Sequence, residues 1–236
     1  MDINRFIDYT NLKAVATKED IKLLCDEAIK YGFASVCVNP CYVELAHDLL
    51  KGSNISVCTV VGFPLGSNKL ATKEFEAIAA VEDGADEIDM VINIGALKNK
   101  DYDYIKEEIE TIRDSIGGKT LKIIVETCYL TEEELKKVTE ICNETYVNFI
   151  KTSTGFGSRG ANLEDIKIIN ENKNEVLEIK ASGGIKTYEE VIAYINNGVT
   201  RIGMSDVSDL IGDSCHCKDD CNCGNECHCN DCKEEN

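Results

Sequence analysis

The sequence has no tryptophan and only two prolines among its 236 residues, and it has few basic residues. Lysine and arginine number 25 against 43 aspartates and glutamates, which gives a formal net charge of −18. This balance argues against a nucleic acid or an anionic membrane as the main partner, because both attract clustered lysine and arginine. The N-terminal residues lack the apolar core of a signal peptide, and no apolar run has transmembrane length. We therefore expect a cytoplasmic protein.

Cysteine, in contrast, is abundant and unevenly placed. Six of the 13 cysteines scatter through the first 214 residues, and seven crowd into the last 22. Without a secretory signal, reduced thiols are the expected state. The composition changes abruptly at Cys215, and the stretch beyond it has no aliphatic side chain with which to build a core. We expect a folded domain over residues 1–213 and a separate Cys/His-rich tail over residues 214–236.

Short β-rich apolar runs alternate with charged stretches of helical periodicity. The stretch from Thr17 to Gly32 combines a capping threonine, an apolar stripe and a terminal glycine, which is typical of a helix. Strands that alternate with helices pair in parallel, and the helices cover the sheet. Eight such units predict a closed (β/α)₈ TIM barrel, and the lack of a G-x-G-x-x-G loop after the first strand argues against a dinucleotide-binding sheet. The eight runs begin at Phe6, Ala34, Ile55, Glu87, Leu121, Val147, Val176 and Val199.

Charged residues stand in several of these runs, near the strand ends where barrel enzymes carry their chemistry. Lys151 and Lys180 occupy two of them, and Asp8 and Asp89 two others. A neutral lysine attacks carbonyls to form a Schiff base, and carboxylates position a second lysine or relay protons. The alternative is that each lysine extends to solvent from a strand terminus. For Glu126, after the fifth run, pocket-lining and packing roles both stay open.

Glycine-rich turns follow several runs, at 61–66, 154–157, 182–185 and 202–205. Backbone amides after the seventh and eighth strands of a barrel commonly bind a phosphate. Glycine also permits tight turns without any ligand. The last two turns are therefore a candidate phosphate site.

Together, several motifs resemble the deoxyribose-phosphate aldolase family. They are V-C-T-V-V-G-F-P-L-G, D-E-I-D-M-V-I-N-I-G-A-L, K-I-I-V-E-T, F-I-K-T-S-T-G-F-G and E-I-K-A-S-G-G-I-K-T. The resemblance extends from about Ile7 to Ser205. It implies a class I aldolase that needs no cofactor for catalysis. Such an enzyme reversibly cleaves 2-deoxy-D-ribose 5-phosphate to acetaldehyde and D-glyceraldehyde 3-phosphate.

The resemblance also implies roles for single residues. Lys151 would form the Schiff base, the charge of Lys180 would favour a neutral Lys151 amine, and Asp8 would hold Lys180. Asp89 would transfer protons with an ordered water. The implied substrate-binding residues are Thr154, Gly183, Gly184, Ser205 and Cys37, although Cys37 also fits a role as a small core residue. Barrels of this family usually form homodimers or larger homo-oligomers, and their other partners are small sugar phosphates and aldehydes.

One motif departs from the family pattern. The eighth-strand motif R-I-G-T-S-S reads R-I-G-M-S-D here, so Asp206 replaces a phosphate-binding serine. A carboxylate that faced the phosphate at ~4 Å would repel it by about 4 kcal/mol at an effective dielectric near 20. A carboxylate that turned away would cost about one hydrogen bond, or about 1 kcal/mol. Arg159 and Lys186 are candidates to offset this change, and an aldolase for other or unphosphorylated aldehydes is the alternative.

The tail has the spacing C-x-C-x₃-C-x-C-x₃-C-x-C-x₂-C and resembles metallothionein in composition. Closely spaced thiolates chelate soft and borderline ions, so Zn²⁺ and Cu(I) are the candidate metals. The Schiff-base route needs no metal, so such an ion would not be catalytic. A non-enzymatic metal buffer on a barrel carrier is a further alternative. The candidate ligands are Cys215, His216, Cys217, Cys221, Cys223, Cys227, His228, Cys229 and Cys232.

Overall fold

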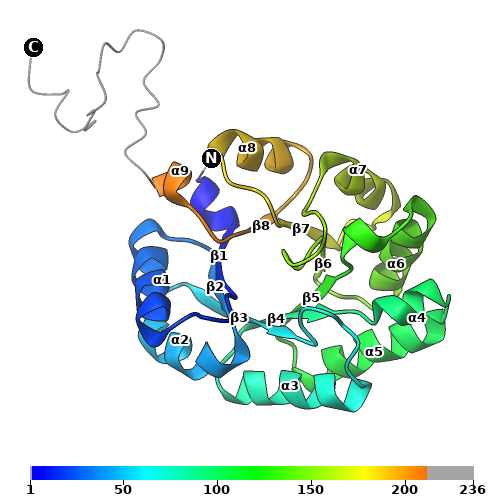
Figure 1. Ribbon diagram of the computed structural model, residues 1–236, viewed down its shortest axis with the longest axis horizontal. Coiled ribbons are helices and arrows are strands. Elements are labelled where there is room, and N and C mark those ends of the chain that lie inside the picture. Colours follow the sequence, from blue (N-terminus) through cyan, green and yellow to red (C-terminus); the bar gives the residue numbers. More distant parts are fainter. Residues whose placement is uncertain (1, 212–236) are drawn as a thin grey trace, which may run out of the picture.

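The computed structural model describes residues 2–211, and the tail with its candidate metal ligands lies outside these residues. Eight parallel strands close into a barrel in sequence order, with β1 paired to both β2 and β8 (Figure 1). The predicted TIM barrel is therefore confirmed. The strands are β1 (Ile7–Asn11), β2 (Ser35–Val38), β3 (Ser56–Val61), β4 (Glu87–Val91), β5 (Thr120–Ile124), β6 (Phe149–Lys151), β7 (Glu178–Ser182) and β8 (Arg201–Met204).

Helices form the outer ring around these strands (Figure 1). The α-helices are α1 (Lys18–Tyr31), α2 (Val43–Leu50), α3 (Leu70–Glu82), α4 (Ile94–Lys98), α5 (Tyr102–Ser115), α6 (Glu132–Glu144), α7 (Leu163–Asn172), α8 (Tyr188–Asn196) and α9 (Ser208–Ile211). Short 3₁₀ turns cover Ile3–Phe6, Pro40–Tyr42 and Thr127–Tyr129. Among the described residues, none of these helices has the length and apolar character needed to cross a membrane.

The ends of α1 follow from its sequence. The Thr17 side chain accepts from the backbone N–H of Asp20, whose carboxylate in turn accepts from the Thr17 N–H. This reciprocal capping satisfies donors that the first turn leaves free. Gly32 ends the helix with φ of 69°, a left-handed conformation that glycine adopts without steric cost.

The protein has two kinds of interior. Between the strands and the helices lies a continuous apolar core rich in isoleucine, valine and leucine. Inside the barrel, a much smaller apolar cluster of Leu12, Cys37, Cys58 and Val60 adjoins buried charged side chains. Alternation along each strand separates the two, because successive side chains point to opposite faces. The barrel interior is therefore where the chemistry of the fold lies.

Candidate active site

The centre of the site is Asp89 on β4, a fully buried carboxylate that binds three lysines. Its Oδ2 accepts hydrogen bonds from Lys151 Nζ on β6 and Lys180 Nζ on β7, each at 2.7 Å. Its Oδ1 accepts from Lys122 Nζ on β5 at 2.9 Å. The strand register produces this convergence, since Asp89 pairs with Lys122 and Lys151 pairs with Lys180.

Two more carboxylates and an arginine extend the network. Asp8 on β1 lies 2.5 Å from Lys180 Nζ and accepts from Arg201 Nη1 at 2.6 Å. Glu87 on β4 lies 3.0 Å from Arg201 Nη1 and 2.5 Å from Lys122 Nζ. Four cationic side chains thus share three carboxylates. We call the seven residues the charged cluster: Asp8, Glu87, Asp89, Lys122, Lys151, Lys180 and Arg201.

Opposite charges favour the ionised forms of Asp89 and Lys180 despite their burial. Burial alone would raise the pKa of Asp89, but the ammonium groups of Lys122, Lys151 and Lys180 hold it well below its ordinary value. Burial alone would lower the pKa of Lys180, but Asp8 and Asp89 raise it. Both shifts favour the charged forms, so the attraction outweighs desolvation at this site.

The structure corrects one sequence-based alternative. Lys180 is fully buried and Lys151 is only 3% exposed, so neither extends to solvent. Asp8, Asp89 and Lys180 also lie within their strands, whereas the sequence placed them at strand ends. The side chains of these three residues point into the barrel, where Lys180 meets both carboxylates.

Sequence reasoning missed three members of the cluster: Glu87, Lys122 and Arg201. A signal for Lys122 was present, because it is a lone lysine between apolar residues of β5. A lysine in such a position is costly to bury without partners. Glu87 stands two residues before Asp89, so period-two alternation places both on the same face of β4.

A cavity of about 230 Å³ opens above Lys151. Its lining includes the predicted substrate-binding residues Thr154, Gly183, Gly184 and Ser205. These residues follow β6, β7 and β8, three consecutive strands of the barrel. The cavity therefore connects the lysine with the glycine turns predicted to bind a phosphate.

Glu126 fixes the wall of this cavity through Thr154. Its carboxylate accepts from the Thr154 backbone N–H at 3.2 Å and from the Thr154 hydroxyl. The same hydroxyl accepts from the N–H of Phe156 at 3.0 Å, so local bonds engage it as donor and acceptor. Glu126 is buried and has φ of 52°, a strained conformation for a residue other than glycine. Glu126 does not itself line the cavity; it holds Thr154, which does.

The turn after β7 brings backbone close to the cavity. Gly183 and Gly184 have φ of 84° and 80°, where side chains are disfavoured. A Cβ at Gly183 would also lie 2.9 Å from Gly160 Cα. After β8, Asp206 Oδ1 accepts from the N–H and hydroxyl of Ser208 at 3.0 and 2.7 Å. The carboxylate is thus engaged at the start of α9, while Ser205 lines the cavity.

Neither predicted compensating cation lines the cavity. The Arg159 guanidinium binds the Asp165 carboxylate at 2.6 and 3.2 Å and the Thr127 hydroxyl at 3.3 Å. Asp165 lies in the first turn of α7, so Arg159 ties its loop to that helix. Lys186 donates its backbone N–H to Glu190 at the start of α8. The structure therefore gives both residues positions outside the cavity lining.

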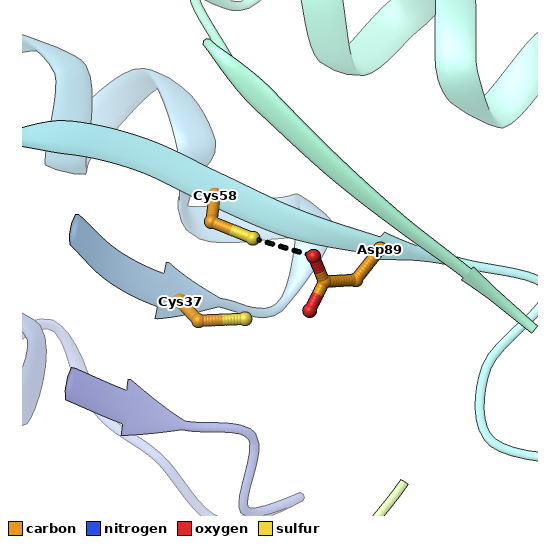
Figure 2. A group of neighbouring side chains, drawn as sticks. All are labelled: Cys37, Cys58 and Asp89. Atoms are coloured by element: carbon orange, nitrogen blue, oxygen red, sulfur yellow. Dashed lines mark hydrogen bonds between the residues drawn. The ribbon is translucent and has the colours of Figure 1, made fainter. Parts of the chain in front are cut away.

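Cys37 is fully buried and is absent from the cavity lining, which agrees with its alternative role as a core residue. It lies opposite Cys58 in the register of β2 and β3, and both thiols approach Asp89 (Figure 2). The three groups have the spacing of a metal site. Metals bind thiolates. Contact with Cys58 lowers the pKa of the Cys37 thiol, but burial and the same contact raise the pKa of the Cys58 thiol well above its ordinary value, so the pair does not supply two thiolates. Asp89 is also saturated by ammonium groups, so we assign no metal to this group.

Comparisons with known proteins agree with this geometry. The model of the DeoC/LacD family aldolases matches residues 6–208. A deoxyribose-phosphate aldolase of Finegoldia magna is 56% identical over 205 residues, which cover 87% of this chain and 96% of that protein. A deoxyribose-phosphate aldolase of Thermococcus gammatolerans is 53% identical over 209 residues, covering 87% of this chain and 93% of the relative.

Solved structures show the same similarity. An aldolase named QR15 superposes with a TM-score of 0.84 at 42% identity, covering 87% of this chain and 92% of that one. The deoxyribose phosphate aldolase of Aeropyrum pernix, described as tetrameric, has a TM-score of 0.83 at 27% identity, covering 89% and 90% of the two chains. The chain, with its buried lysines around Asp89, is an enzyme that belongs to the DeoC/LacD aldolase family.

Proposed function

We propose that the enzyme reversibly cleaves 2-deoxy-D-ribose 5-phosphate to acetaldehyde and D-glyceraldehyde 3-phosphate through a Schiff base on Lys151. The observation that carries this proposal is the position of Lys151 Nζ. It lies 2.7 Å from Asp89 Oδ2, and the residue lines a cavity that extends to Gly183, Gly184 and Ser205. The names of the relatives support the choice of substrate.

The reaction begins when the Lys151 amine attacks C1 of the open-chain sugar and water leaves, which forms an iminium ion. Removal of the C3 hydroxyl proton lets the C2–C3 bond break, and its electrons move into the iminium to give an enamine. The three-carbon fragment, C3 to C5 of the sugar, leaves as glyceraldehyde 3-phosphate. Protonation of the enamine at C2 and hydrolysis then release acetaldehyde and free the lysine. No cofactor is required in this sequence of steps.

The charged cluster supports this route in two ways. Nucleophilic attack requires the neutral amine. Because four cationic side chains share three carboxylates, the cluster tolerates the loss of one proton without leaving a carboxylate unpaired. Lys180, held by Asp8 and Asp89, keeps its charge and opposes a second charge on Lys151. Asp89 touches both lysines and is the proposed proton carrier for the C3 hydroxyl and the enamine carbon.

Borohydride trapping tests the proposal. The protein is incubated with 2-deoxyribose 5-phosphate and borohydride, and the adduct is located by peptide mass mapping. We expect an adduct on Lys151 that is absent in Lys151→Ala and retained in Lys119→Met, a matched variant at a half-buried lysine outside the charged cluster. An adduct on another lysine, or none in the folded protein, would overturn the Schiff-base assignment.

Other aldehydes remain the second candidate substrates because Asp206 replaces a phosphate-binding serine. The Asp206 carboxylate is bound to Ser208, which supports the less costly of the two alternatives, loss of a single hydrogen bond. Family membership favours an enzyme over a barrel that only carries a metal buffer. We also propose a cytoplasmic homo-oligomer, in line with the tetramer described for the Aeropyrum pernix structure.

For the tail, we propose binding of Zn²⁺ or Cu(I) by a separate unit over residues 214–236. The support is the regular C-x-C spacing of its seven cysteines. All residues of the charged cluster lie in the barrel strands, outside the tail, so we assign no step of the aldol chemistry to the tail.

A further inference from the structure

Lys13 is a cavity residue to which the sequence motifs gave no role. It lies in the loop between β1 and α1, and it lines the same cavity as Gly183, Gly184 and Ser205. Within the described part of the chain, the cationic side chains in that lining are Lys13 and Lys151. Because Lys151 is bound to Asp89 in the barrel, Lys13 is the one available to an anionic group at the entrance.

The backbone around Lys13 is fixed by hydrogen bonds. Its carbonyl accepts from the Ala16 N–H at 3.1 Å and from the Asn39 side-chain amide at 3.3 Å. Its N–H donates to the Asn11 side chain at 3.4 Å. These contacts tie the loop to β1 and to the residue after β2. The backbone of Lys13 is therefore held beside the cavity, and its exposed side chain extends from this short loop.

Charge near the cavity gives a second argument. Asp206 lies next to Ser205 in sequence and is exposed. The pKa of Asp206 is lowered, mainly by its hydrogen bonds with Ser208 and to a smaller extent by the nearby ammonium groups of Lys186 and Lys13. Both ammonium groups thus act on the Asp206 carboxylate, and Lys13 is the one that also lines the cavity. Lys186 is also close to Asp206 but does not line the cavity. The two lysines therefore differ in their access to a ligand in the cavity.

We propose that Lys13 is the cation that recognises the substrate phosphate at the glycine turns and that it offsets Asp206 in selecting phosphorylated over unphosphorylated sugars. This inference rests on the proposed function, because it requires a phosphorylated substrate. The phosphate accepts from backbone amides of the turn after β7 and from the Lys13 ammonium. Asp206 stays bound to Ser208, on the side of Ser205 that leads into α9.

The test compares 2-deoxyribose 5-phosphate with 2-deoxyribose in wild type and four variants. Lys13→Met removes the charge at similar length, and Lys13→Arg retains it. Lys186→Met is the matched control, since Lys186 is also near Asp206 but outside the cavity lining. Asp206→Ser restores the serine of the family motif. For each protein, kcat and KM are measured separately, and the ratio of the two kcat/KM values gives the phosphate preference.

We expect Lys13→Met to lower the phosphate preference about tenfold, mainly through KM for the phosphorylated sugar, as expected for one hydrogen bond to a charged group. Lys13→Arg should retain most of the preference, Lys186→Met should match wild type, and Asp206→Ser should raise it. A wild-type preference that survives Lys13→Met, or one lost in Lys186→Met instead, would overturn the inference alone. A wild type without phosphate preference would overturn the proposed substrate as well, so the two failures are distinguishable.

Discussion

Replacing Lys122 with methionine tests whether the surplus positive charge of the charged cluster matters to the reaction. Lys122 is fully buried on β5, and its ammonium group contacts Glu87, Asp89 and Cys58 at 2.5, 2.9 and 3.3 Å. Methionine has similar length and volume but no charge. The substitution therefore removes one cation and leaves three cationic side chains on three carboxylates.

The first consequence is a loss of stability. Removing one partner of a buried ion pair costs about 3–5 kcal/mol, because the other charge stays buried. Glu87 keeps Arg201 at 3.0 Å, and Asp89 keeps Lys151 and Lys180. We therefore expect a value near the lower end, about 3 kcal/mol. Denaturant unfolding followed by circular dichroism measures it.

The second consequence concerns the nucleophile. Lys122 and Lys151 bind opposite oxygens of Asp89. Two like charges at roughly 6 Å repel by about 3 kcal/mol at an effective dielectric near 20. Without this repulsion Lys151 keeps its proton more readily. The cleavage rate at neutral pH should fall about a hundredfold, since each 1.4 kcal/mol is a factor of about ten. The rate should recover as pH rises.

The assay is cleavage of 2-deoxyribose 5-phosphate as a function of pH. Lys122→Arg, which keeps the charge, should stay closer to wild type than Lys122→Met. Lys119→Met, at the half-buried lysine just before β5 that pairs with Asp86, controls for general loss of a lysine in this region. A folded Lys122→Met protein with the rate and pH profile of wild type would refute the argument from surplus charge.

Further predictions follow from other buried groups and from the tail. Lys73 and Glu108 form a fully buried ion pair at 2.6 Å. Lys73→Met should lower the free energy of unfolding by about 3–5 kcal/mol because it leaves the Glu108 charge buried, and the double variant with Glu108→Leu should lose less, as measured by urea unfolding. The pKa of Asp89 is lowered in the folded protein, so this carboxylate contributes stability that is fully present above pH ~4 and is lost as the pH falls through the folded-state pKa. In Asp89→Asn, the melting temperature should therefore change less between neutral pH and strong acid than in wild type. Glu126→Gln should weaken the hold on the cavity wall and raise KM about fivefold in steady-state assays, in line with one weakened hydrogen bond. A chain ended after Asp213 should keep its cleavage rate and lose zinc or copper stoichiometry by metal analysis, and loss of the rate would contradict two independent units.

The architecture was predictable because the pattern of the strands repeats. All eight expected strands are present, and their ends differ from the expected runs by a few residues. Small errors of this kind leave the barrel intact, because parallel order and helix coverage depend on alternation along the whole chain. They do affect the site, since a shift of one residue reverses the face to which a side chain points. Lys180 illustrates this, because it stands third in β7 and points into the barrel.

The charged cluster was only partly predictable, for a related reason. Asp8, Asp89, Lys151 and Lys180 stand out as charged residues in apolar runs, and the last three lie in family motifs. Lys122 belongs to such a motif too, but its role appears only when the register places it opposite Asp89. Register depends on how far each strand is shifted along its neighbour, and neither composition nor periodicity of one strand contains that shift.

The side chains at the predicted phosphate site belong to loops, and the periodicity of a sequence does not indicate where a loop side chain points. Arg159 has the right charge and follows the right strand, yet Asp165, six residues later, binds its guanidinium. Asp206 is directed by Ser208 two residues on, a short-range capping pattern that could have been read from the sequence. Lys13 lies far away in the chain, and β1 and β8 become neighbours only because the barrel closes. Closure therefore adds to the phosphate end a cation from the first loop, which no motif around β7 or β8 could supply.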